Sequence, residues 1–266
     1  MIKKSLEKII KPVNIEFDEV NHTYINPHSN EMYTGCTTIS GAWKKDFLAP
    51  WYAKEMYLAL EDKFEFIKKL KEEKKYTELL MEAKFSAPKK GKKAMEDGKL
   101  AHEYFQKFVE IKIIGKGNKI ILPQSPEACK AIVAFIKWQQ ERNPEWLASE
   151  LLVASDEHRI AGTLDGLANI DGIPTLIDFK TSSQIGSDAL LQCAGYDIML
   201  SSMGFQVRQY LVLRTPKDGK PAEEVVIDNL QEIKFLKETF MHQREAHKFY
   251  VYTENKLKER LKIKSR

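Results

Sequence analysis

Two β-strand patterns meet at Asp171-Gly172, and this junction constrains the fold more than any other feature of the sequence. The segments on either side, Ile160–Ile170 and Thr175–Lys180, are rich in Ile, Leu, Val and Thr. Asp-Gly between two such segments is a strong signal for a hairpin with a two-residue turn. With this dipeptide at the centre of the turn, the numbers of opposed residues add up to 343, so Asp165 faces Asp178 directly.

This register brings charged groups together on one face of the predicted hairpin. Counting outward from the turn makes Asp165 and Asp178 a non-hydrogen-bonded pair, in which side chains approach most closely. Two opposed carboxylates, with Cβ atoms about 4.5–5.5 Å apart, repel by about 0.2–1 kcal/mol in an ordinary sheet. Lys180 lies on the face of Asp178, because side chains two residues apart share a face, whereas Phe179 points the other way into the core.

Two carboxylates and a lysine on one patch are typical of a metal-dependent hydrolytic site. Hard carboxylate oxygens suit Mg²⁺ or Mn²⁺, which also bind phosphate. A lysine beside the metal can orient the attacking water and neutralise charge in the transition state. The alternative is that both acids are surface residues and that Lys180 pairs with one of them. The apolar neighbours of Asp165 and Asp178 disfavour it, because buried acids need a partner or a metal.

The rest of the chain reads as a helical first part followed by an α/β part. A hairpin is expected over residues 15–34, around an Asn-Pro-His-Ser-Asn turn. Apolar spacing then predicts helices over 37–51, 51–60, 64–81 and, after a break at Ser86-Ala87-Pro88 and a lysine-rich connection, 94–112. Further on we expect a helix over 126–142, strands over 150–155, 160–170 and 175–180, a helix over 188–203, strands over 207–213 and 224–227, and a helix over 230–261.

Length and composition predict one soluble domain. A chain of 266 residues with 43% hydrophobic and 30% charged residues can bury a large core. Cys36, Cys129 and Cys193 are odd in number and lack CxxC spacing, which disfavours a disulfide framework or a zinc site and favours a reducing compartment. No apolar run approaches the roughly 20 residues of a membrane span, so we expect a cytoplasmic protein that does not bind membranes.

The distribution of charge is more informative than the net charge of +4. Lysines are concentrated in residues 84–99, and basic residues dominate 256–266. Clusters of this kind raise the local potential where a phosphate backbone could lie, although a solvated helix face and a basic tail would look the same. We predict that the first cluster forms a basic wall that guides DNA towards the metal, through Lys89, Lys90, Lys92 and Lys93.

Three short elements together resemble a known family. Gly162-Thr163-x-Asp165, then Asp178-Phe179-Lys180-Thr181, then Gln192-x-x-x-Tyr196 are similar to the RecB-like branch of the PD-(D/E)XK nucleases. Through motifs the resemblance covers about residues 98–196. It implies a restriction-endonuclease-like α/β core, a central mixed sheet flanked by helices in the order α-β-β-β-α-β, within a single domain of residues 1–266. Residues 1–93 would form a hairpin and helical elaboration over the active face, and residues 94–266 the core with a C-terminal helix.

The resemblance also implies roles for individual residues. Glu150 matches an additional acid of the family, and His102 matches a helix histidine that can reach the metal. The carbonyl of Phe179 would be a further metal ligand beside Asp165 and Asp178. In the family the Gln-x-x-x-Tyr pair helps to hold DNA, so Gln192, Tyr196 and Thr181 are expected to contact it. Members with an iron-sulfur cluster need four cysteines, so we expect no such cluster here.

The N-terminal part resembles phage-type members and the mitochondrial genome maintenance exonuclease, through His22-x-Tyr24, Thr37-Thr38-Ile39 and Trp51. This implies an exonuclease acting on single strands or duplex ends in recombination, replication or repair, with recombination or replication proteins as candidate partners. A structure-selective endonuclease and a non-catalytic DNA-binding protein on the same fold remain alternatives. A phosphatase or sugar-phosphate enzyme is disfavoured because the sequence has no Gly-rich phosphate loop.

Overall fold

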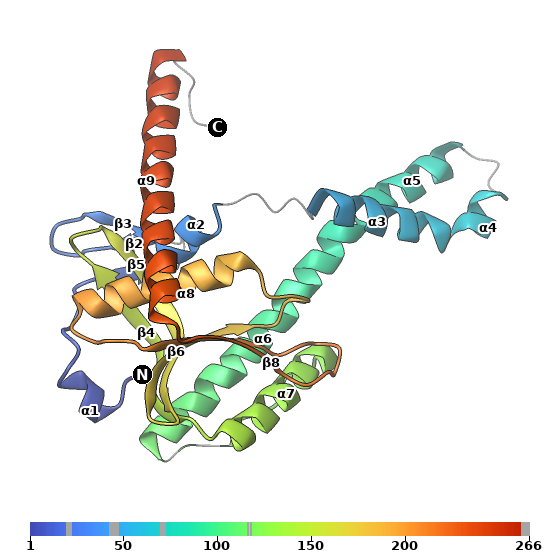
Figure 1. Ribbon diagram of the computed structural model, residues 1–266. Coiled ribbons are helices and arrows are strands. Elements are labelled where there is room, and N and C mark those ends of the chain that lie inside the picture. Colours follow the sequence, from blue (N-terminus) through green and yellow to red (C-terminus); the bar gives the residue numbers. More distant parts are fainter. Residues whose placement is uncertain (20–22, 43–47, 70–72, 116, 118, 262–266) are drawn as a thin grey trace. The chain divides into compact units, whose positions relative to one another are not determined.

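The computed structural model describes residues 1–19, 23–42, 48–69, 73–115, 117 and 119–261, and the chain divides into two compact units. The first unit contains Met1–Trp43 and Ala101–Arg266, and the second contains Lys44–Leu100. The expected α/β class is confirmed, because the first unit is built on a central mixed sheet flanked by helices (Figure 1). His22 lies outside the described residues.

The sheet has the strand order β1-β2-β3-β5-β6-β7-β8, with β4 paired to β5. Neighbours are antiparallel except for the pairs β3·β5 and β6·β7, which are parallel. The strands are β1 (Glu16–Asp18), β2 (Thr23–Ile25), β3 (Met32–Gly35), β4 (Glu145–Ser155), β5 (Ile160–Ile170), β6 (Ile173–Lys180), β7 (Gln209–Arg214) and β8 (Glu223–Ile227).

The predicted hairpin register is confirmed where β5 and β6 pair. The ladder runs from Ile170↔Ile173 at the turn to Gly166↔Ile177, and every pair adds up to 343. Asp171 and Gly172 both have positive φ, 52° and 80°, as a two-residue turn between twisted strands requires. The β4 strand begins five residues earlier than expected, at Glu145 rather than Glu150, because buried Trp146, Leu147 and Ala148 continue the strand across a register shift.

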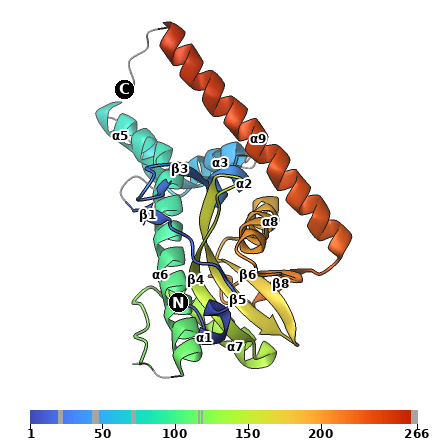
Figure 2. The ribbon, with the colours of Figure 1, turned by 90° about the vertical axis from the view of Figure 1, so that its left-hand side faces the viewer.

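Helices cover both faces of this sheet, as Figures 1 and 2 show for α7 and α8. One core lies under α8 (Ser187–Ser202) and α9 (Leu230–Leu261), and a second core contains residues of α7 (Pro126–Arg142) and of α6 (Ser86–Ile114) from Ala101 onwards. Phe105 and Phe135, both fully buried, pack against Phe179 of β6. The order α7-β4-β5-β6-α8-β7 matches the expected α-β-β-β-α-β. Two short helices complete the unit, α1 (Lys4–Glu7) and α2 (Cys36–Ser40).

The second unit is helical and corrects one expectation. It contains α3 (Leu48–Glu61), α4 (Phe64–Ile67), α5 (Glu73–Lys84) and the first part of α6. The lysine-rich segment 89–93 is not a connection, because α6 already begins at Ser86. Pro88 does not prevent this, since it occupies the first helical turn, where backbone N–H groups have no intrahelical acceptor. The helix expected over 37–51 is also shorter, since α2 ends at Ser40 and residues 43–47 lie outside the described part.

Candidate active site

The candidate site lies where β5 and β6 separate. Their ladder ends at Gly166↔Ile177, and the same edge of β5 then pairs with β3 at Thr34↔Ile160 and Gly35↔Ala161. Between these two ladders, residues 162–165 of β5 pair with neither β3 nor β6. We call this interruption of the strand pairing the opening. Asp165 is the first residue beyond the end of the β6 ladder, and its sequence-predicted partner Asp178 continues β6 beside β7, opposite Val212. Both acids lie next to the last pair of this ladder, and the direct pairing of Asp165 with Asp178 that the register predicted is not part of it.

Asp165 closes the end of the β5·β6 ladder. Its Oδ2 accepts a hydrogen bond from the backbone N–H of Phe179 at 2.7 Å, which replaces the ladder bond lost where the strands part. The strand is irregular here, because Leu164 and Leu167 are three residues apart and yet both belong to the core under α8. Burial raises the pKa of Asp165, although Lys180 and the Phe179 N–H oppose this effect.

Asp178 is a buried carboxylate whose hydrogen-bonding capacity is not used. Its side chain is 1% exposed and lies 2.6 Å from Lys180 Nζ. The contact is an ion pair rather than a well-directed hydrogen bond, since neither carboxylate oxygen has a hydrogen-bond partner among the described residues. Burial is the largest cause that raises the pKa of Asp178 to about 6, and the charge of Asp165 adds to it, while Lys180 opposes it. Buried polar atoms normally have partners, so the Oδ1 atom, which has none among the described residues, is available to a ligand.

Lys180 is held by a chain of contacts that crosses to α8 and returns to β5. Its Nζ donates to Gln192 Oε1 at 3.2 Å, and Gln192 Nε2 donates to the Tyr196 hydroxyl at 2.9 Å. That hydroxyl donates to the Thr163 carbonyl at 2.8 Å. Burial alone would lower the pKa of Lys180, but Asp178 and Asp165 raise it above its usual value, so the ammonium stays charged.

Gly162 permits this arrangement. A Cβ at this position would lie 2.7 Å from the Tyr196 ring and 3.1 Å from Cys36 Cβ. The ring therefore packs directly on the strand backbone, which brings its hydroxyl to the Thr163 carbonyl. Gly162 is the first residue of the three elements that resemble the nuclease family. Glycine is needed at this position because a larger residue would collide with the Tyr196 ring.

Glu150 lies on β4 opposite Asp165. The flanking pairs Ser149↔Gly166 and Leu151↔Leu164 fix this position, although Glu150 itself interrupts the regular strand with a φ of 47°. A positive φ is uncommon for a residue other than glycine and costs of the order of 1–3 kcal/mol. Burial and the charge of Asp165 raise the pKa of Glu150 to about 7. Three acids thus follow one another across three neighbouring strands.

His102 of α6 belongs to the first unit and packs beside Phe179, which lies between Asp178 and Lys180 on β6. Its ring centroid is 6.2 Å from that of Phe179 and 5.7 Å from that of Phe105. Burial, and then the charge of Lys180, lower the pKa of His102 to about 4, although Asp178 opposes them. The imidazole is therefore neutral at physiological pH, as a metal ligand has to be.

The donor set at the opening fits a hard cation. Within the part of the chain that the structure describes, no three His, Cys, Asp or Glu side chains are gathered as a ready-made metal cage. Mg²⁺ is commonly bound by only one or two carboxylates, keeps several waters and takes further oxygens from substrate phosphate. The carboxylates of Asp178, whose Oδ1 has no partner among the described residues, and of Asp165 suit that mode of binding. The metal role of the Phe179 carbonyl stays a prediction.

The residues expected to bind DNA fall into two groups. Gln192 and Tyr196 are engaged within the protein, as described above, and Thr181 directly follows Lys180 and is half-buried. The predicted basic wall belongs to the second unit, so its role at the site stays a prediction. All four of its lysines are exposed, and Lys90 pairs with Glu55: Lys89, Lys90, Lys92 and Lys93.

Three side chains around the opening were not singled out as site residues from the sequence. The Tyr24 hydroxyl lies 3.4 Å from Thr163 Oγ1, and Cys36 Sγ donates to the Gln192 carbonyl at 3.5 Å. Cys193 is buried, and the charge of Asp178 contributes to raising its pKa, after burial. Burial raises the pKa of both thiols, so they act as apolar walls rather than as nucleophiles.

Comparison with known proteins gives no family assignment. No family model matches the sequence, and no curated protein does. Among solved structures, an alkaline exonuclease (LHK-Exo) from Laribacter hongkongensis overlaps with a TM-score of 0.32 at 13% identity, over 57% of this chain and 84% of that chain. Its complex with dAMP gives a TM-score of 0.29 at 13% identity over the same shares, and SSO0001 gives 0.26 at 16% identity over 53% and 69%. Overlaps this weak do not establish an activity for this chain.

A search of the helices in the described part of the chain finds none that is long and apolar enough to cross a membrane.

Proposed function

We propose that this chain is a metal-dependent DNA nuclease of the PD-(D/E)XK type, which hydrolyses phosphodiester bonds. One observation carries the proposal: Asp165, Asp178 and Lys180 meet where β5 and β6 part, and both oxygens of buried Asp178 lack a hydrogen-bond partner among the described residues. A carboxylate held this way destabilises the metal-free protein, because an ionised group loses its hydration without full compensation. A bound cation would supply that compensation.

Asp165 and Asp178 would hold one or two Mg²⁺ or Mn²⁺ ions, and Glu150 and His102 are the candidates for further ligands. When bound, the cation supplies Lewis acidity towards the phosphate and lowers the pKa of a bound water. Lys180 keeps its proton, so it would bind and orient a phosphate oxygen or the water and offset negative charge in the transition state. Gln192 and Tyr196 position that lysine through the contacts to its ammonium and to the Thr163 carbonyl.

Exonuclease action on single strands or duplex ends is our preferred form of this activity, in phage-type DNA recombination, replication or repair. The motifs of the RecB-like branch support this choice. Partners among recombination or replication proteins belong to the same proposal.

The test is an incubation of the purified chain with end-labelled single-stranded, double-stranded and circular DNA, in Mg²⁺, in Mn²⁺ and in EDTA. We expect cleavage of linear DNA with either metal and none in EDTA, with products that shorten from an end. Cleavage of circular DNA would establish the endonuclease alternative. Binding without cleavage under every metal condition would establish the non-catalytic alternative and reject the proposal.

A further inference from the structure

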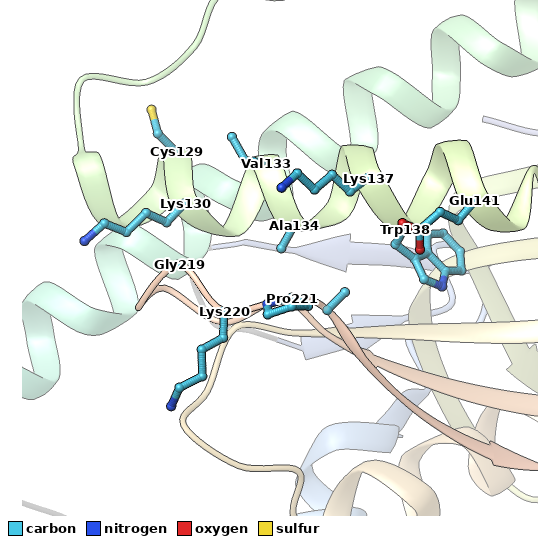
Figure 3. A pocket seen from close by; sticks show the side chains of 11 residues that line it. Cys129, Lys130, Val133, Ala134, Lys137, Trp138, Glu141, Gly219, Lys220 and Pro221 are labelled. Atoms are coloured by element: carbon cyan, nitrogen blue, oxygen red, sulfur yellow. The ribbon is translucent and has the colours of Figure 1, made fainter.

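A hollow of about 590 Å³ lies on the side of the first unit away from α8, between α7 and the turn that joins β7 to β8 (Figure 3). One wall is a single face of α7, since residues 130, 134, 137, 138 and 141 follow helical spacing. The other wall is the segment Gly219–Ala222. The walls approach at one end, where a Cβ on Gly219 would lie 3.9 Å from Lys130 Cδ, and at the other end Trp138 Nε1 donates to Glu224.

The hollow combines an apolar floor with a positive rim. Val133, Ala134 and Pro221 contribute apolar surface, while the charged lining residues are Lys130, Lys137, Lys220 and Glu141. Within the described part of the chain, Lys130 and Lys137 have no ion-pair partner, and Lys220 pairs only with exposed Asp218 at 2.9 Å. An exposed pair of this kind contributes little, so all three ammonium groups are available to a ligand. The occupant that fits is an extended polyanion with apolar parts.

The dimensions match a short stretch of single-stranded DNA. Lys130 and Glu141 are eleven residues apart on one helix, which corresponds to about 17 Å. At about 3.4 Å per nucleotide along one strand, this length takes about five nucleotides, or fewer when the strand is stretched. Sugars and bases would lie on Val133, Ala134 and Pro221, and phosphates would face the lysines, which is how single strands are bound without sequence choice.

The chain connects this hollow to the candidate active site. In the β6·β7 ladder, Lys180 lies opposite Arg214, the last residue of β7. The backbone N–H of Thr215 donates to the Lys180 carbonyl at 2.8 Å. The same turn then carries Lys217, whose charge contributes to lowering the pKa of His102, and reaches Gly219 five residues after Arg214. Five residues span at most about 18 Å, so the hollow begins within that distance of the end of β7.

We propose that this hollow is an accessory binding groove for single-stranded DNA, which holds the strand as it passes around the end of β7 to or from the active site. The proposal rests on the proposed nuclease function. It adds where the DNA binds, that the bound DNA is single-stranded, and how many nucleotides are bound. A substrate of about ten nucleotides is long enough to occupy the site and the groove together, because at most about 18 Å separates the groove from the end of β7 and the groove holds about five nucleotides. Shorter oligonucleotides occupy either the site or the groove, but not both.

The test measures binding of fluorescein-labelled oligothymidylates of 6 and 20 nucleotides to the full chain by anisotropy, in EDTA and over a range of salt. The variant K130Q/K137Q/K220Q is compared with the parent and with K4Q/K8Q/K11Q, which removes the same charge from exposed lysines of the N-terminal segment. Three lost contacts with a single strand lower the salt slope by about 2, which weakens the 20-mer about 100-fold at 0.1 M salt relative to 1 M. The groove variant weakens the 6-mer less than the 20-mer, because the 6-mer can still bind at the active site; the control variant stays at parental affinity, and Glu141→Gln tightens the 20-mer.

Several results would overturn the groove. One is that the groove variant and the parent bind the 20-mer with equal affinity. Another is that the control variant weakens binding as much as the groove variant does. A third is that polyglutamate competes as effectively as unlabelled oligonucleotide. Lys137→Gln alone, with about a third of the change in slope, provides the same test if the triple variant does not fold. The two proposals fail separately: cleavage by the parent with unaffected binding in the groove variant rejects only the groove, whereas groove-dependent binding without cleavage rejects only the nuclease.

Discussion

Replacement of Asp178 by Asn should stabilise the metal-free protein while it abolishes cleavage. Asp178 is 1% exposed, and its pKa is raised from 3.8 to about 6, chiefly by burial. This rise corresponds to about 3 kcal/mol that the ionised carboxylate costs the folded state. Asn has the shape of the protonated acid and carries no charge. Asp178→Asn should therefore raise the free energy of unfolding at pH 8 by up to about 3 kcal/mol, or about 6–12 °C in Tm for a chain of this size.

The pH dependence follows from the same shift. Between the unfolded pKa of 3.8 and the folded pKa of about 6, the folded protein binds more protons than the unfolded chain. Stability of the parent therefore falls as the pH rises through this window, and the loss is complete above it. Asp178→Asn removes this contribution, so the two proteins should have similar stability near pH 4 and diverge towards pH 7.

The assay is urea denaturation in EDTA at several pH values from 4.5 to 8, with parent, Asp178→Asn and the control Asp228→Asn, which changes an exposed carboxylate in the same way. Addition of Mg²⁺ should stabilise the parent and leave Asp178→Asn unchanged. The reasoning is refuted if Asp178→Asn is less stable than the parent at pH 8, because the ion pair with Lys180 would then outweigh the cost of burial. Retained cleavage by this variant would refute the site itself.

Three further predictions concern the surroundings of this carboxylate. Lys180→Ala should abolish cleavage in the end-labelled DNA assay and keep the native circular dichroism spectrum; full activity would remove this lysine from the site. Tyr196→Phe should lower the free energy of unfolding by about 0.5–1.5 kcal/mol in urea denaturation, since it leaves the half-buried Thr163 carbonyl without its donor, and an unchanged midpoint would contradict that contact. Replacing the four lysines of the predicted basic wall by Gln should lower the salt slope of DNA binding by about 3, raise KM and leave kcat nearly unchanged; slopes parallel to those of the parent would contradict the wall, whose members are Lys89, Lys90, Lys92 and Lys93.

Much of the candidate site could be predicted because it is local in sequence. Asp171-Gly172 selects one turn, and the turn selects one register, since a slip by a single residue would exchange the two faces of both strands. Asp165 and Asp178 are each six residues from that turn, so no distant part of the chain is needed to bring them to the same end of the hairpin. The order of helices and strands was predictable for a similar reason, because apolar periodicity is a property of each segment.

The tertiary structure decided how these residues act. The register could not show that β5 leaves β6 beyond Gly166 and turns to β3, because β3 lies more than a hundred residues earlier in the chain. Asp165 therefore becomes an acceptor for the Phe179 N–H instead of one member of a flat pair. The positive φ of Glu150 was equally hidden, because nothing in the preferences of glutamate indicates it.

Lys180 shows most clearly which features the sequence determines and which depend on the tertiary structure. Lys180 follows Asp178 by two residues. Because side chains alternate between the two faces of a strand, this spacing alone places both on the same face. The contact of Lys180 with Gln192, and the return through Tyr196 to Thr163, depend on α8 packing against the strands closely enough to require Gly162. The hollow beside α7 depends in the same way on a helix and a turn about ninety residues apart. Contacts between segments that are distant in sequence arise only when the whole core packs, because no local rule fixes the distance between a helix and the sheet beneath it.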